Sequence, residues 1–139
     1  MKKSEMHNAM KTVEWSFEAD EDIRAGTAVW LYVRRLMRSY DATLVVRVPL
    51  GGRVHTPLII GVTRAAAKAG HKVPVVLRGH MRLKHPCKAW AHKSAWTTAN
   101  GVLVPWELVL RGKWTKQVGW FTDKVVLVIM DHCAKRKMR

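Results

Sequence analysis

DEDIRAGTAVWLYVRRLMRSY, residues 20–40, carries apolar side chains at the spacing of an amphipathic helix. At about 100° per residue, they gather on one arc while the arginines gather on the opposite arc. Asp20 suits the N-cap position, because its carboxylate accepts hydrogen bonds from the first free backbone N–H groups. The stretch therefore predicts a helix from Asp20 to about Tyr40. Its apolar arc holds Ile23, Val29, Trp30, Val33, Leu36, Met37 and Tyr40. Its basic arc holds Arg24, Arg34, Arg35 and Arg38.

A second helix is expected over residues 56–69. Thr56 is a suitable cap, Pro57 fits the first turn and Gly70 fits the C-terminal stop. The inward-facing residues of this helix are Leu58, Val62, Ala65, Ala66 and Ala69. Its outward face carries Arg64 and Lys68.

Strands are predicted before, between and after the two helices. Residues 12–18 alternate between apolar and polar side chains, as a half-buried strand does. Residues 42–48 are rich in β-branched side chains, which favour a strand. Residues 72–77 form a shorter strand in which Pro74 favours an edge position, because proline lacks a donor for the ladder. The last predicted strands are 102–110, 113–121 and 124–130.

This order of elements predicts a single α+β domain. The expected fold is a mixed sheet with two helices packed on it and a C-terminal antiparallel meander, with right-handed crossovers. Residues 78–98 fit either a loop or a short helix that begins at Pro86. The expected divisions are a flexible N-terminus at 1–11, the α+β domain at 12–134 and a basic tail at 135–139.

Charge is the strongest functional signal in the composition. The 139 residues include 25 Lys and Arg against 10 Asp and Glu, which gives a formal net charge of +15. Such a surplus repels itself unless an anionic partner or solvent relieves it. The hydrophobic content of 48% is ordinary for a globular domain and predicts a buried core. The expected partner is therefore a polyanion, and nucleic acid is the first candidate.

Cysteine content and the N-terminal sequence indicate the compartment. Cys87 and Cys133 are too few for the disulfide framework of a small secreted domain, so free thiols in a reducing, cytoplasmic setting are expected. Residues 1–11 lack the apolar stretch of a signal peptide. No window approaches the roughly 18 apolar residues of a membrane helix. Neither export by that route nor a membrane-spanning segment is expected.

Binding to RNA or single-stranded DNA, without catalysis, is the favoured function. Basic helix faces suit a phosphate backbone, since guanidinium groups match phosphate oxygens and counterion release supplies affinity. Residues 78–96 mix cations with His and Trp, a pattern typical of single-strand binders whose rings stack on bases. The competing explanations are a solvated helix face and Trp side chains packed in the core. The helix group is Arg24, Arg34, Arg35, Arg38, Arg64 and Lys68. The second group is Arg78, Arg82, Lys84, Lys88, Trp90, Lys93 and Trp96.

An open-sheet surface of the RNA-recognition type is not expected. Glu14, Glu18 and Glu107 alternate onto the sheet face opposite the helices, where carboxylates repel phosphate. The aromatic signature of that module is also missing from the sequence.

Two other functions remain as alternatives. A small metal-independent ribonuclease needs a general base and acid with pKa values near neutrality, and cations that hold the phosphate. His55 is the first candidate for that chemistry, with His80 or His85 as its partner, although nothing in the sequence places two imidazoles together. The other alternative is a basic interaction protein that docks an acidic protein surface.

No metal or nucleotide cofactor is expected. The His and Cys residues that could bind zinc lack the paired spacing of a zinc knuckle. These residues are His85, Cys87, His92, His132 and Cys133. His132 and Cys133 are adjacent in sequence, so on a strand or helix their side chains point in different directions. Gly51 and Gly52 match neither phosphate-binding pattern, GxGxxG or GxxxxGK followed by Ser or Thr.

Overall fold

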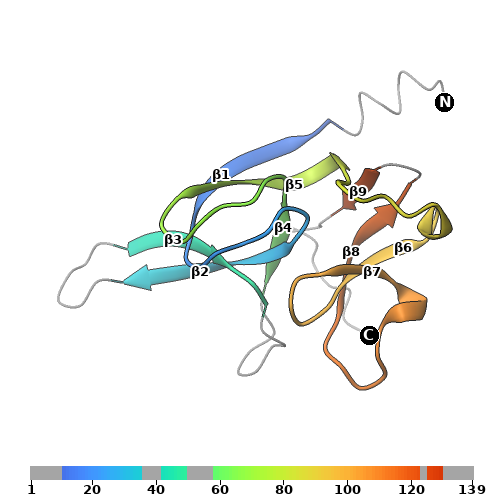
Figure 1. Cartoon of the computed structure of the whole chain (residues 1–139). Helices are drawn as coiled ribbons and strands as arrows, with labels where there is room; N and C mark the ends of the chain where they lie inside the picture. Colours follow the sequence, from blue (N-terminus) through green and yellow to red (C-terminus); the bar gives the residue numbers. More distant parts are fainter. Residues whose placement is uncertain (1–10, 36–41, 50–57, 123–124, 130–139) are drawn as a thin grey trace, which may run out of the picture.

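The computed structural model describes residues 11–35, 42–49, 58–122 and 125–129, and within these ranges it is built from nine strands in one sheet (Figure 1). The strand order is β1-β3-β2-β4-β5-β9-β8-β6-β7, with a further pairing between β1 and β5. The strands are β1 (Val13–Ala19), β2 (Ala28–Arg35), β3 (Ala42–Arg47), β4 (Ile59–Thr63), β5 (Lys72–Arg82), β6 (Ser94–Thr97), β7 (Leu103–Pro105), β8 (Lys116–Phe121) and β9 (Val125–Ile129).

Strands β1 to β5 close into a barrel. The pairing of β1 with β3 is parallel and the other pairings around the ring are antiparallel. Residues Val13 to Glu18 of β1 pair with Arg78 to Lys72 of β5 and so complete the ring, which removes the free edges of an open sheet. Figure 1 shows this group on one side of the molecule and β6 to β9 on the other.

Strand β5 joins the barrel to the added strands. Its second half pairs with β9, from Arg78 opposite Ile129 to Arg82 opposite Val125. Between the halves lies Gly79, whose φ of +111° favours glycine. A Cβ atom there would lie 2.6 Å from the Thr12 Cα, so glycine also permits the close approach of β1.

Two apolar cores result from this arrangement. The first is built from barrel residues alone: Ala19, Ile23, Val29, Val46, Ile60, Val73 and Val75. The second lies between the outside of the barrel and the added strands: Ala28, Ile59, Val62, Val76, Met81, Ala95, Leu103, Val118, Phe121, Val126 and Val128. The added strands therefore cover one side of the barrel with their inner face.

The predicted α+β class is wrong, because the described residues contain no helix of seven or more residues. Two 3-10 turns, η2 (Lys88–Trp90) and η3 (Trp106–Leu108), are the helical segments within the described ranges. Residues 28–35 of the first expected helix form β2. Val29 and Leu31 contribute to the first core, whereas Trp30 packs on the second. Because this strand is covered on both faces, its apolar residues do not alternate and the sequence imitates a helix.

The second expected helix fails for the same reason. Residues 59–63 form β4, which is buried along its whole length. Ile59 and Val62 pack in the second core and Ile60 in the first. Thr56 and Pro57, which supplied the expected cap, lie outside the described residues.

Strands β1 and β3 were predicted, and β5 extends beyond its predicted end at Leu77 to Arg82. Of the C-terminal meander, the antiparallel pairing of its last two strands, β8 and β9, is as predicted, but the pairing of its first strand is wrong. β8 pairs with β6 and β9, whereas β7 pairs with β6. The predicted strand 102–110 ends at Pro105, where η3 begins. Both expected ends, 1–11 and 135–139, lie outside the described residues except for Lys11.

Asp20 holds a network of ion pairs on the barrel. Its carboxylate accepts hydrogen bonds from Arg34, at 2.9 Å, and from Arg47. Arg34 also donates to Glu18, and Arg47 lies 3.9 Å from the ring centre of Tyr32. Burial raises the pKa of the Asp20 carboxyl, but the hydrogen bonds from Arg47 and Arg34 outweigh burial and leave that pKa below its ordinary 3.8.

Asp20→Asn is expected to lower the free energy of unfolding by about 1 to 2 kcal/mol at neutral pH, because Arg34 and Arg47 lose the negative charge between them and one of them faces an amide NH2 group. A lowered pKa stabilises the fold above pH 3.8 and stops doing so as the pH falls through the folded-state value. The difference between variant and wild type should therefore shrink below about pH 4 in urea titrations. Glu107→Gln, at an exposed pair 3.5 Å from Lys93, is the control and should change stability by less than about 0.5 kcal/mol. An equal loss at all pH values would contradict the role given to the carboxylate.

Candidate nucleic-acid interface

The added strands present an exposed face on the side away from the barrel, which we call the outer sheet face. On β5, Met81 is buried in the second core, and the register with β9 places Arg78, His80 and Arg82 on the other side, opposite Ile129, Leu127 and Val125. The same alternation places outward Val125 and Ile129 of β9, Trp120 of β8, Ser94 and Trp96 of β6, and Val104 of β7.

The sheet register places cations beside an aromatic ring. His80 pairs with Leu127, Leu127 with Trp120, and Trp120 with Ser94, so these backbone positions form one row across four strands. With a strand spacing of about 4.8 Å, Trp120 lies about 10 Å from His80. Arg78 and Arg82 flank His80 at two residues on either side. The outer sheet face thus holds a basic column next to Trp120.

Three Trp side chains on this face are exposed to solvent or in contact with one another. Trp120 is 45% exposed and Trp106 is 55% exposed. The ring of Trp96 lies 4.6 Å from that of Trp106, and its Nε1 donates a 2.8 Å hydrogen bond to the Ser94 hydroxyl. Trp96 is therefore fixed by its neighbours and supports the more exposed Trp106.

The uncompensated positive charge concentrates around this face. The sequence holds no Asp or Glu from Ala42 to Trp106. Residues 78–122 carry eight Lys and Arg against the single carboxylate of Glu107. Among the residues that the structure describes, no ion pair involves Arg78, Arg82, Lys84 or Lys88. Arg111 and Lys113 line a hollow of about 380 Å³ beside Trp106.

The cations of the barrel are, in contrast, largely neutralised by carboxylates of residues 14–22. Arg64 pairs with Glu14, and Lys68 lies 3.9 Å from Asp22. Arg34 donates hydrogen bonds to Glu18 and Asp20, and these bonds, the one to Glu18 most, raise the pKa of Arg34. The basic helix faces that were predicted to grip phosphate are absent from the described residues. Arg34 and Arg35 lie on β2, whereas Arg24, Arg64 and Lys68 lie in the segments between strands.

The predicted contact residues are therefore divided among several places. Arg24 is exposed in the turn before β2. Arg35 ends β2, but its side chain lies outside the described residues, as does Arg38. Trp90 packs on the second core with its ring 5.2 Å from Phe121. Lys93 lies 3.5 Å from Glu107. Arg78, Arg82 and Trp96 come together on the outer sheet face, with Lys84 and Lys88 exposed in the segment that follows β5.

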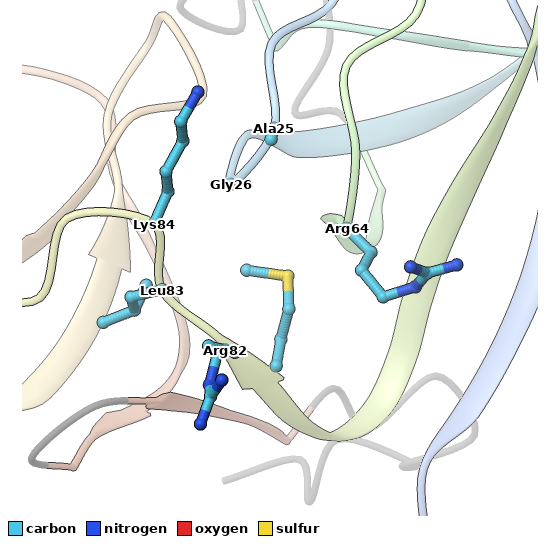
Figure 2. A pocket seen from close by; sticks show the side chains of 7 residues that line it. Ala25, Gly26, Arg64, Arg82, Leu83 and Lys84 are labelled. Carbon is cyan, nitrogen blue, oxygen red and sulfur yellow. The ribbon is translucent and has the colours of Figure 1, made fainter.

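A cleft of about 520 Å³ opens beside the end of β5 (Figure 2). It is lined by Ala25 and Gly26, by residues 81–84, and by Arg64, which lies across the cleft from Lys84 in Figure 2. Figure 2 shows the side chains of Arg64, Arg82 and Lys84 pointing in three different directions. Because Arg64 is held by Glu14, the cleft does not gather its cations around one anion.

The histidines and cysteines suggested for other chemistry are placed as follows. His80 lies on the outer sheet face and His85 is exposed in the loop after β5, whereas His55 lies outside the described residues. Cys87 is a free thiol. Within the described ranges, no three His, Cys, Asp or Glu side chains are grouped to hold a metal ion.

Trp106 and Trp120, with Arg111 and Lys113, were missed by the sequence argument. The one local signal is Pro105, which ends β7 and places Trp106 in the exposed turn η3. Trp120 reaches this face through the pairing of β8 with β6, which no short-range pattern predicts.

Comparisons with known proteins add neither a family nor a fold relative. None of the helical segments in the described ranges has the length and apolar character needed to cross a membrane. No protein-family model matches the chain, no curated protein matches its sequence and no solved structure matches its fold.

Proposed function

We propose that this protein binds nucleic acid through the outer sheet face and the basic segments beside it. The observation that carries the proposal is the separation of charge. Carboxylates of residues 14–22 pair with barrel cations, and residues 78–122, with eight Lys and Arg against one Glu, carry +7 of the formal +15. A polyanion with regularly spaced charges suits such a surface, and the release of its condensed counterions supplies affinity.

Two features favour nucleic acid over an acidic protein surface. Arg78 and Arg82 lie on one strand at a spacing of four residues, about 13 Å, and form a column that a phosphate backbone follows. Exposed Trp rings lie beside that column and offer flat apolar surfaces for bases. An acidic protein surface would pair with the arginines, but it has no bases to stack on the exposed Trp rings.

The full chain is expected to bind labelled single-stranded RNA or DNA with strong salt dependence. If about five phosphates are neutralised, the affinity should fall about 130-fold between 0.1 and 0.4 M salt for a single strand and about 500-fold for duplex DNA. Titrations with single-stranded RNA, single-stranded DNA and duplex DNA across a salt series measure both slopes.

The same titrations separate the alternatives. RNA recovered intact in excess EDTA identifies binding without cleavage, whereas cleaved RNA identifies the metal-independent nuclease. If the protein binds none of the three nucleic acids at low salt, the proposal is wrong and an acidic protein partner becomes the explanation of the +15 charge.

A further inference from the structure

From the geometry of the outer sheet face we infer that the ligand is a single strand whose bases stack on Trp120 and Trp106. This inference rests on the proposed function and names the form of nucleic acid that the same surface takes. The phosphates would lie against Arg78 and Arg82 at one end of the path and near Arg111 and Lys113 at the other. The strand thus crosses the sheet at a steep angle to β5, β9, β8 and β6.

The path has cations at both ends and aromatic rings between them. Four strand spacings separate β5 from β7, a distance of about 19 Å. Trp120 lies between, on β8, and Trp106 follows β7 directly. The hollow beside Trp106 is lined by Arg111 and Lys113, so the second cationic group adjoins the second ring. A site of this length is suitable for several nucleotides, as in other single-strand-binding β-barrels.

The rings themselves favour a single strand over a duplex. A base inside a duplex is stacked on its neighbours and offers no free face to a protein ring, whereas an unpaired base does. Trp120 has buried neighbours, Gly119 and Phe121, so its ring stands out from a strand anchored in the second core. Trp96 supports Trp106 from below through the 4.6 Å ring contact. The Trp106 ring is therefore supported before a ligand binds, and the backbone of Trp120 is fixed by its buried neighbours, which reduces the entropy lost on binding.

Two carboxylates of the described residues lie near the ends of the path. Glu14 follows Val13, the partner of Arg78 in the sheet, and is paired with Arg64. At the other end, the hollow beside Trp106 is lined by Glu107. The Glu107 side chain is directed to Lys93, at 3.5 Å, and this pairing reduces its repulsion of phosphate. Electrostatic repulsion of a negatively charged nucleic-acid strand along the outer sheet face is therefore small.

Trp120→Ala is expected to weaken binding of a short oligothymidylate by about 5- to 150-fold at constant salt, because one stacked base loses its partner. The slope of affinity against salt should stay unchanged, since no phosphate contact is lost. Trp120→Tyr should restore most of the affinity by restoring a ring. The matched control is Trp15→Ala, which removes a ring that is 62% exposed on barrel strand β1 and should leave binding unchanged.

A second comparison tests stacking without any change in the protein. Wild type should bind the oligothymidylate more tightly than an abasic strand with the same number of phosphates, and Trp120→Ala should remove most of that preference. Equal affinity of wild type for both strands overturns the inference, as does an unchanged affinity of a Trp120→Ala protein that melts like wild type. Either result leaves the proposed function intact if salt-dependent binding persists. Loss of all nucleic-acid binding by wild type is a different outcome, and it refutes both.

Discussion

Replacing both Arg78 and Arg82 by Glu is expected to weaken binding of single-stranded nucleic acid at least about 25-fold at 0.1 M salt. The loss of two phosphate contacts accounts for that factor and lowers the slope of log affinity against log salt by about 1.4. The two new carboxylates add repulsion to this loss. Both side chains are exposed on β5, so the exchange should leave the fold intact. Fluorescence anisotropy titrations of a labelled strand at several salt concentrations measure the affinity and the slope together.

The control for this variant is Lys72→Glu, a change at the other end of the same strand. Lys72 is exposed and lies ten residues before Arg82, up to about 33 Å away along β5. The control changes net charge by two, so any effect that depends on net charge alone appears there at half strength. If Lys72→Glu weakens binding half as strongly as the double variant on a logarithmic scale, the outer sheet face has no special role.

Sequence patterns predicted β1, β3 and the first part of β5, and they failed for β2 and β4. β1 shows clear alternation, and β3 is a short β-branched run, so both were found. β2 and β4 lie between the barrel interior and the added strands. There, Val29 and Trp30 are neighbours in sequence but belong to different cores, and this pattern has no period of two. Apolar side chains that point to both faces of a strand can match the period of a helix, and this produced the wrong prediction.

The candidate site was predicted in composition but not in position. Residues 78–96 were expected to carry cations, and Arg78 and Arg82 do lie on the outer sheet face. The predicted helix stripes are not found, because Arg34 and Arg35 lie on β2, and Arg34 is paired with Glu18. Trp120 and Trp106 come together on this face only because β8 pairs with β6, where Trp120 lies opposite Ser94, 26 residues before it. Local patterns carry no information on such pairings.

Two of the carboxylates that disfavoured an open-sheet surface lie outside the outer sheet face. Glu14 and Glu18 lie on β1 of the barrel, where Arg64 and Arg34 neutralise them. They are not on the outer sheet face, because that face is built from β5 to β9. The carboxylates that argued against sheet-based recognition therefore help to leave this face positive.

Gly61→Ala is expected to destabilise the protein by about 3 kcal/mol or more and to lower its melting temperature by about 10 °C. Gly61 lies in β4, where strands from both cores pack closely. An added Cβ would lie 2.2 Å from the backbone oxygen of Val76 and 2.9 Å from Val75 Cγ1. A backbone atom of a paired strand cannot move aside as a flexible side chain does, so β4 and β5 would have to separate. Urea and thermal unfolding measure the loss.

The sign of this effect is informative because Gly61 has no positive φ. Alanine at an ordinary, open strand position stabilises a protein by about 0.4 to 1 kcal/mol, since it restricts the unfolded chain. Gly70→Ala is the control for backbone strain without a steric clash, because Gly70 has a φ of +84° and no atom lies within 4 Å of the added Cβ. It should cost about 1 to 2 kcal/mol from backbone conformation alone. A Gly61→Ala protein as stable as wild type, or more stable, would mean that β4 does not lie this close to β5. The packing of the added strands on the barrel, and with it the outer sheet face, would then need a different description.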